Sequence, residues 1–145
     1  EAANYVIDGW VKVVGCTCMT YIYGIKVLGS SNWEGVIFFK MCLAGKVCFC
    51  KVDKTGRINS TNNFGIMAGA HSLVHTFNND ISNITGGSGV NAAIQCYETS
   101  RMCSYHNTGS NNAIGLRASS GTIMKLGTQP TGVTEEAIGS GGVIR

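Results

Sequence analysis

Two β-favouring runs around a short glycine-containing segment decide the fold class: residues 36–43 read VIFFKMCL, residues 44–46 read AGK and residues 47–52 read VCFCKV. Both runs are rich in Val and Phe, which pack well on a pleated sheet, and neither contains Pro or Gly. The Ala-Gly-Lys segment is short enough for a tight turn, although it lacks the Asn-Gly pair typical of hairpins. The sequence therefore predicts a β-hairpin over residues 36–52.

Shorter β-favouring runs flank this segment on both sides. Before it, apolar and aromatic residues cluster at residues 5–7, 10–14, 16–23 and 25–28. After it, short apolar runs alternate with connectors rich in Gly, Ser and Asn, and from residue 92 onward they recur about every ten residues. This spacing is typical of meanders, sandwiches, barrels and solenoids, and no strict internal repeat is evident. The later runs are residues 65–68, 72–77, 92–98, 102–106, 113–118 and 122–126.

A chain of 145 residues forms one domain of ordinary size. The sequence predicts a single all-β domain, an antiparallel β-sandwich or barrel-like fold with short Gly/Asn/Ser-rich turns. Within residues 1–145 we expect a strand-rich and Cys-rich part at 1–58, a short-strand meander at 59–127 and a tail at 128–145. The tail contains one expected helical turn at 134–138, and its Gly/Ser content predicts that a neighbouring subunit holds it in place.

Charged residues are scarce, at 13% of the chain, and 44% of the residues are hydrophobic. This balance excludes a disordered chain, and no apolar run is long enough for a transmembrane helix. The net charge of +3 falls entirely within residues 1–60, where seven Lys and Arg outnumber four Asp and Glu, while residues 61–145 carry four of each. The lysines are mostly isolated, so solvated strand positions are favoured over a surface for nucleic acid.

The low content of charged residues and the high content of apolar residues also indicate what kind of partner the protein has. Monomeric surfaces usually carry ~25–35% charged residues, which keep copies of a protein apart. A chain with half that share has either a neutral polar surface or a surface that it covers with its own copies. We therefore expect a homo-oligomer or polymer, joined by strand pairing and apolar edges within residues 5–52.

The cysteines leave two interpretations open. Two C-x-C pairs place their side chains on one face of a strand, and a predicted hairpin over residues 92–106 would set Cys96 opposite Cys103. Disulfides in an oxidising compartment are one interpretation, and small buried thiols in a reducing compartment are the other. A four-thiolate zinc site is disfavoured because flat strands do not give a tetrahedral arrangement. The candidate disulfide cysteines are Cys16, Cys18, Cys42, Cys48, Cys50, Cys96 and Cys103.

Two glycosylation sequons favour a location outside the cell. Asn59 begins an Asn-Ser-Thr sequon and Asn83 begins an Asn-Ile-Thr sequon, and both lie in turn-rich segments, where an acceptor is exposed. Sequons also arise by chance in a chain with twelve Asn. We expect an extracellular protein or one on a virion surface.

Candidate catalytic groups are few. His71 and His75 are four residues apart but lack the Glu of the H-E-x-x-H zinc motif. Cys103 and His106 could act as thiol nucleophile and base, but no recognised oxyanion turn surrounds Cys103. With eight Asp and Glu and three His, the composition argues against an enzyme, and we expect no cofactor and no metal.

Tyr97 and Tyr105 are candidates for an aromatic glycan platform, since flat rings stack on sugar faces. The predicted hairpin over residues 92–106 would bring the two rings near one another. Core or cross-strand packing is the alternative role of these side chains.

The last third of the chain resembles a group of surface proteins in its composition. Residues 111–117 read NNAIGLR and residues 122–126 read TIMKL, within a Gly/Asn/Ser-rich stretch at 109–127. This text is similar to the strand and turn segments of phage fibre and other virion surface proteins, and of secreted adhesin and filament subunits. The resemblance contains no defining motif and carries over no functional residue.

These observations together predict a structural role. We expect a self-assembling subunit of an extracellular, pilus-like filament or of a virion, such as a fibre, capsid or decoration protein. A secreted glycan-binding or adhesin module, with a receptor on a cell surface, is the alternative. A cysteine-dependent or zinc-dependent enzyme is the third.

Overall fold

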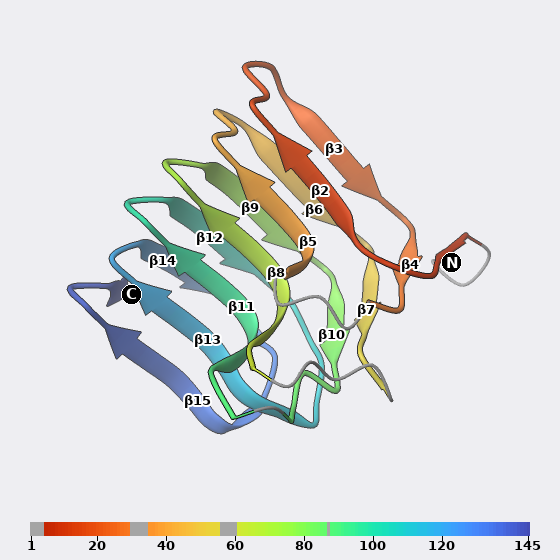
Figure 1. Cartoon of the computed structure of the whole chain (residues 1–145), viewed down its shortest axis with the longest axis vertical. Helices are drawn as coiled ribbons and strands as arrows, with labels where there is room; N and C mark the ends of the chain where they lie inside the picture. Colours follow the sequence, from red (N-terminus) through yellow and green to blue (C-terminus); the bar gives the residue numbers. More distant parts are fainter. Residues whose placement is uncertain (1–4, 30–34, 56–60, 87) are drawn as a thin grey trace.

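The protein is a β-solenoid, in which the chain winds in successive coils that stack strand upon strand (Figure 1). The computed structural model describes residues 5–29, 35–55, 61–86 and 88–145. Every strand pairing within these ranges is parallel, and none of these residues is helical. The same ranges accordingly hold no helix that could cross a membrane.

The described strands form three sheets, and the order within each sheet follows the order along the chain. The front sheet contains β2 (Val11–Val14), β5 (Gly35–Lys40), β8 (Asn63–Gly69), β11 (Asn91–Tyr97), β13 (Asn112–Ser119) and β15 (Gly132–Gly139). The back sheet contains β3 (Thr20–Tyr23), β6 (Gly45–Cys48), β9 (Leu73–Phe77), β12 (Arg101–Tyr105), β14 (Thr122–Leu126) and β16 (Val143–Ile144). The side sheet contains β1 (Val6–Ile7), β4 (Lys26–Val27), β7 (Lys51–Asp53) and β10 (Asp80–Ser82).

The all-β prediction is confirmed, but the predicted antiparallel sandwich or barrel is wrong. The runs at residues 36–43 and 47–52 do not form a hairpin, because the first becomes β5 in the front sheet and the second contributes to β6 and β7 in the other sheets. β5 pairs with β2 and β8, and β6 pairs with β3 and β9, each one coil away. The predicted hairpin at 92–106 separates in the same way into β11 and β12.

The corners explain why the chain enters a new sheet at each turn. Left-handed backbone conformations recur there, coil after coil. Between the front and back sheets they occur at Gly15, Met41, Ala70, Glu98 and Ser120. After the back sheet they occur at Gly24, Phe49, Asn78, His106 and Gly127. For side chains such as Met41 (φ 53°) and Phe49 (φ 54°) this conformation costs ~1–2 kcal/mol each, which the pairing of the adjoining strands must offset.

Coil length changes along the chain, which is why no strict repeat appears in the sequence. The step between in-register partners of the front sheet is 29 residues from Ile37 to Ile66 but 20 residues from Leu116 to Glu136. The side sheet ends at β10, so the later coils run mainly between the front and back sheets. A fixed period therefore does not describe this solenoid.

The hydrophobic core fills the space that the sheets enclose. The front sheet contributes an inner row of fully buried isoleucines at Ile37, Ile66 and Ile94, and β10 adds Ile81. A smaller cluster lies on the outer face of the front sheet. Its buried members are Phe38, Phe64, Met67 and Ala92.

Ladders of buried asparagine join successive coils. Asn79 donates to the carbonyl oxygen of Val47 (3.0 Å) and to Oδ1 of Asn107 (2.9 Å). Asn63 donates to Oδ1 of Asn91 (2.7 Å). Both ladders join residues 28 positions apart, the length of one coil. Every buried side-chain nitrogen and oxygen in the described ranges has a hydrogen-bond partner, as a close-packed interior requires.

The segment at 128–145 is the last coil. Residues 134–138, where we expected a helical turn, lie within β15, which pairs with β13, and β16 pairs with β14. Strand pairing with an existing sheet edge outweighs the weak local helix signal of Thr134. Strands of the same chain therefore pair with this segment.

Candidate functional site

The two ends of the solenoid are the candidate functional site, because among the described strands the outermost ones pair on one side only. β1, β2 and β3 form the N-terminal end, and β15 and β16 form the C-terminal end (Figure 1). An edge strand presents a row of backbone N–H and C=O groups with which another chain can pair. The two ends lie at opposite extremes of the stack.

The N-terminal end carries an exposed apolar surface. We define the N-terminal surface as the exposed large hydrophobic residues Tyr5, Val6, Ile7, Trp10, Val14, Met19, Tyr21 and Tyr23. Tyr5 is 72% exposed and Tyr23 is 65% exposed. Among the described residues, these eight are nearly half of the seventeen exposed large hydrophobic side chains, although they come from the first coil alone.

The inner rows of the core also remain apolar up to this end. Val11 and Val13 of β2 are partly buried against the core, and Ile22 of β3 is buried. Lys12 lies between the two valines, but its Nζ is 5.6 Å from the ring centroid of Trp10, on the outer face of the front sheet. No charged side chain therefore occupies the inner positions of β2 and β3.

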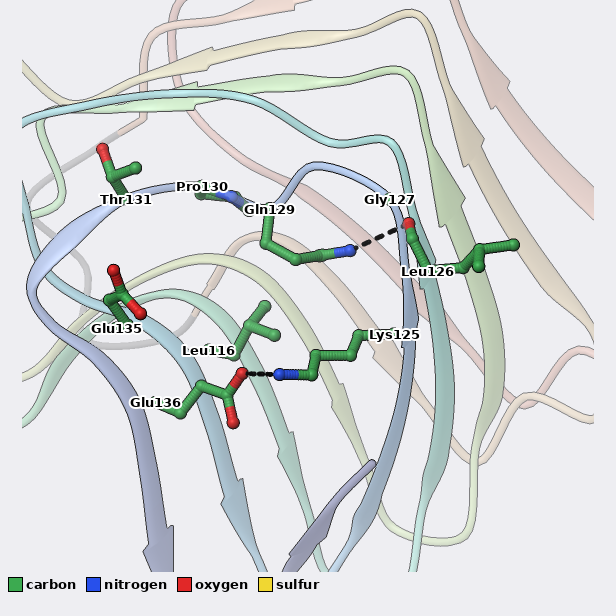
Figure 2. A pocket seen from close by; sticks show the side chains of 9 residues that line it. All are labelled: Leu116, Lys125, Leu126, Gly127, Gln129, Pro130, Thr131, Glu135 and Glu136. Atoms are coloured by element: carbon green, nitrogen blue, oxygen red, sulfur yellow. Dashed lines mark hydrogen bonds and ion pairs between the residues drawn. The ribbon is translucent and has the colours of Figure 1, made fainter.

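The C-terminal end places charges at corresponding inner positions. Glu136 follows Leu116 in the inner row of the front sheet, and Lys125 follows Ser104 in that of the back sheet. Figure 2 shows the two charged side chains pointing toward one another, and they form an ion pair. Together with Glu135 they line a depression of about 390 Å³ at this end. Charged side chains therefore occupy the last inner positions of the core at this end. Both remain in contact with water, since each is more than one-third exposed.

The remainder of the C-terminal end is apolar. Ile138 lies in β15 and is 62% exposed, and Ile144 of β16 packs partly against the core. Val133 is almost fully exposed. The charges thus occupy one part of this end, around the depression.

Three cysteines belong to the core. The Sγ atoms of Cys42, Cys50 and Cys96 lie 3.2–3.3 Å from backbone carbonyl oxygens. Burial raises the pKa of Cys50 and raises the pKa of Cys96 to about 12, so both thiols stay protonated at neutral pH. The predicted proximity of Cys96 to Cys103 is wrong, because β11 and β12 lie in different sheets. All seven cysteines are free thiols in this structure.

The C-x-C pairs lie in neighbouring coils but in different surroundings. Cys16 and Cys18 connect β2 to β3 at the N-terminal end, where Cys18 is exposed. Cys48 ends β6 and is buried, which raises its pKa although the charge of Lys46 acts in the opposite direction. In the described part of the chain, no group of three or more His, Cys, Asp or Glu side chains could hold a metal ion.

One thiol and one imidazole lie in register on adjacent strands of the back sheet. Cys103 of β12 is in register with His75 of β9, on the outer face of the back sheet. His106 occupies the corner after β12. His71 lies at another corner, where its Nδ1 is 2.6 Å from the hydroxyl of Thr99. His71 and His75 consequently share no common ligand position.

Tyr97 and Tyr105 do not form one platform, because they belong to the front and back sheets respectively. The Tyr97 ring stacks near Phe38, with centroids 6.4 Å apart, whereas Tyr105 lies 6.4 Å from the ring of His75. The Tyr105 contact joins adjacent strands, as cross-strand packing does, whereas Tyr97 reaches across β8 to Phe38.

A shallow depression of about 150 Å³ lies beside Tyr97 on the front sheet. Phe64 and Tyr97 supply its aromatic lining, and Gln95 and Arg117 supply polar groups. The guanidinium of Arg117 donates to Oε1 of Gln95 (3.1 Å), so the polar side is fixed in position. An aromatic ring beside an amide and a guanidinium is a combination that can bind a small polar ligand.

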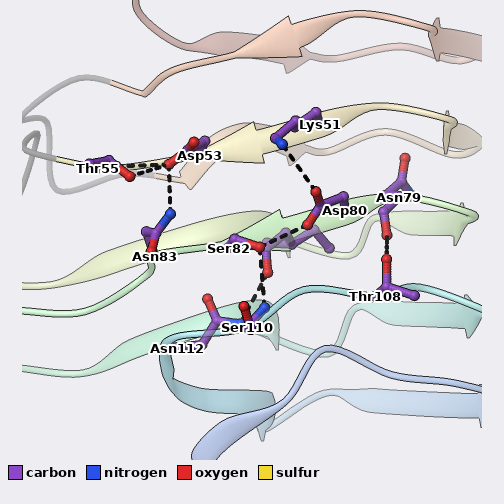
Figure 3. A network of polar contacts seen from close by, with 11 residues as sticks. Lys51, Asp53, Thr55, Asn79, Asp80, Ser82, Asn83, Thr108, Ser110 and Asn112 are labelled. Atoms are coloured by element: carbon purple, nitrogen blue, oxygen red, sulfur yellow. Dashed lines mark hydrogen bonds and ion pairs between the residues drawn. The ribbon is translucent and has the colours of Figure 1, made fainter. Parts of the chain in front are cut away.

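Of the two sequon asparagines, Asn59 lies outside the described residues and Asn83 lies in the polar network shown in Figure 3. Nδ2 of Asn83, the atom that carries a glycan, donates to Oδ1 of Asp53 (2.9 Å). Partial burial by itself raises the pKa of Asp53, but hydrogen bonds from Thr55 and Asn83 outweigh it and lower this pKa overall. A glycan on Asn83 would leave one N–H on Nδ2 for the contact with Asp53.

No family model, curated protein or solved structure matches this chain. The geometry of the two ends is therefore the basis for a function. Sequence reasoning missed the inward-pointing charges at the C-terminal end. A signal was present, since strand alternation puts Lys125 on the same face as Ile123 and Glu136 on the same face as Ile138.

Proposed function

We propose that the chain is a structural subunit that assembles with copies of itself through the N-terminal surface, in an extracellular filament or a virion. The observation that carries this proposal is the concentration of exposed apolar side chains beside the open edges of β1, β2 and β3. A solenoid suits such a role, because each coil contacts only its neighbours and its end can accept a further strand layer.

Covering the N-terminal surface is energetically favourable. These side chains lie on more than one face of the first coil, since Val14 belongs to the front sheet and Tyr21 and Tyr23 to the back sheet, so a partner at the open edges would cover those that lie beside the edges. Fully burying one Val, Leu or Phe side chain contributes ~1.5–3 kcal/mol, and this surface offers eight large side chains on each copy. Partial burial on both partners is thus of the same order as the ~4–15 kcal/mol that association costs in lost freedom.

Sedimentation velocity over a wide range of protein concentration tests this proposal. We expect oligomers that dissociate on dilution, and we expect Tyr5→Ser with Val6→Ser to shift dissociation to higher concentration. Both side chains are exposed, so their replacement removes little from the fold. The matched control is Val133→Ser with Ile138→Ser, two exposed residues of β15, which should leave dissociation unchanged. A monomer at every concentration would contradict the proposal.

Glycan binding is the second candidate function, and the depression beside Tyr97 favours it. A glycan array probed with the wild-type chain would identify a sugar ligand. Tyr97→Ala should then abolish that binding, while Tyr105→Ala on the opposite sheet should not. An array without any binding would eliminate this candidate.

A further inference from the structure

We infer that two copies join N-terminal end to N-terminal end as a closed two-fold dimer, and that inward-pointing charges block the C-terminal end against stacking. The inference rests on the proposed self-assembly and adds the identity of the joining ends. Its occupant is a second copy of this chain.

The first step is a comparison of what each end offers to a new coil. A strand layer added at the N-terminal end would cover Val11, Val13 and Ile22, which are apolar inner residues. A layer added at the C-terminal end would cover Lys125, Glu135 and Glu136 around the depression. Covering these three groups removes water from charges, which is unfavourable even for a paired Lys and Glu.

Head-to-tail stacking therefore brings unlike surfaces together. Continuing the strand register would set Glu136 of one copy over Val11 of the next, while Lys125 lies one layer deeper, in β14, and reaches this end through its ion pair with Glu136. The apolar inner rows would then meet charges, with no opposite charge on the inner face of β2 or β3 to receive them. Inward-pointing charges are a known way in which proteins protect a sheet edge.

Joining two N-terminal ends matches apolar surface with apolar surface. The edge of β2 would pair with β2 of the second copy in the antiparallel sense that a two-fold axis imposes. Lys12 does not oppose this contact, because its ammonium lies against the outer rings of Trp10 and Phe38. Such an interface uses the same patch on both copies and closes on itself, so assembly through this end stops at two, and a filament or shell needs a further contact between dimers.

Sedimentation velocity and negative-stain electron microscopy of the whole chain and of Lys125→Met with Glu136→Met test this inference. The wild type should form discrete dimers that do not grow with concentration. The double variant removes the ion pair at once and leaves Glu135 as the remaining charge among the lining residues, so its C-terminal end becomes more apolar and dimers should link into longer chains. The matched control is Lys51→Met with Asp80→Met, another exposed ion pair (3.4 Å) on the side sheet (Figure 3), and it should stay dimeric.

The outcomes separate this inference from the proposed function. Wild-type monomers at all concentrations would refute both. Wild-type filaments would support self-assembly but overturn end-to-end closure, as would a folded double variant that remains dimeric. If the double variant does not fold, Val6→Glu gives a second test. It places a charge on the exposed strand β1 and should yield monomers, and persistent dimers would contradict the inference.

Discussion

At the N-terminal end the inner rows of the core finish in Val11, Val13 and Ile22, whereas at the C-terminal end the same rows include Glu136 and Lys125. Both ends belong to one parallel stack, so backbone pairing does not distinguish them. The side chains at the inner positions do. The difference teaches that two open ends of one stack can differ in the polarity of a few inward-pointing residues, and charges at such positions are one way in which proteins protect a sheet edge.

We expect the largest effect on stability when a residue in the middle of an inner row is replaced, and a much smaller one when a residue at the end of the row is replaced. Ile94 is fully buried in β11, while Ile138 is 62% exposed in β15. We expect Ile94→Ala to lower the free energy of unfolding by ~2–5 kcal/mol, because it leaves a cavity in packed surroundings. Ile138→Ala should cost less than ~1 kcal/mol. Urea unfolding of both variants measures these free energies. An equal loss of stability in both would contradict the account, because it would mean that Ile138 in the last coil is packed as tightly as Ile94 in the middle.

A second comparison concerns Lys54, which is 1% exposed and donates to Oδ1 of Asn63 (2.7 Å). Burial lowers its pKa from 10.5 to about 8. The unfolded state therefore holds this proton more tightly than the folded state, so the contribution of Lys54 to stability rises as the pH increases from about 8 to about 10.5. The change amounts to ~2–3 kcal/mol.

Lys54→Met isolates that contribution, because ionisation of the thiols is common to both proteins. Between about pH 8 and about pH 10.5 the wild type should gain stability relative to the variant, because the Met side chain does not titrate. Denaturant unfolding at several pH values checks the slope. If the difference in unfolding free energy between the two proteins does not depend on pH, then Lys54 is not a buried charged lysine. Lys125 provides the comparison, because it is paired and partly exposed at the C-terminal end.

An intermediate effect is expected from the asparagine ladders. Asn79 accepts from the backbone N–H of Cys50 (2.9 Å) and is buried, whereas Asn111 is exposed and donates to Asn83 (2.8 Å). We expect Asn79→Ala to cost ~1–3 kcal/mol, because it leaves buried backbone groups without partners. Asn111→Ala should change stability by less than ~0.5 kcal/mol. Thermal unfolding of both variants measures the two losses of stability. Equal losses would contradict the difference between the buried Asn79 and the exposed Asn111.

The last prediction concerns the chemical reactivity of the thiols and involves no change in stability. Cys18 is exposed at the N-terminal end, whereas Cys96 is fully buried in the core. An aromatic disulfide reagent should modify Cys18 in the native dilute protein and reach Cys96 only after unfolding. Mass spectrometry of the digested adducts identifies the site. Modification of Cys96 at a native rate would contradict its place in a packed interior.

The composition was sufficient to predict an all-β chain but not its pairing. Val and Phe in residues 36–52 indicate strands in any sheet, and their periodicity is the same for parallel and antiparallel partners. The deciding residues are at the corners. Met41 and Phe49 adopt a left-handed conformation that these residue types rarely take, so local preference favours a hairpin that tertiary packing overrides.

The candidate site was predicted in part. Low charge and apolar residues within 5–52 pointed to an associating surface, and the N-terminal surface lies within that range. The ladder partners Asn63 and Asn91 were visible in the sequence, but a coil length that falls to 20 residues concealed their period of 28. The ion pair between Lys125 and Glu136 could not be predicted from the sequence, because the two side chains face each other only after the last coil has formed.

Hydrogen–deuterium exchange of the wild-type chain, compared between dilute and concentrated samples, tests the central claim most directly. Backbone amides are protected where a strand edge gains a partner. We predict that concentration protects amides of β1, β2 and β3 and leaves those of β15 and β16 unchanged. Protection at both ends, or at β15 and β16 alone, would contradict the assignment of the N-terminal end as the joining surface.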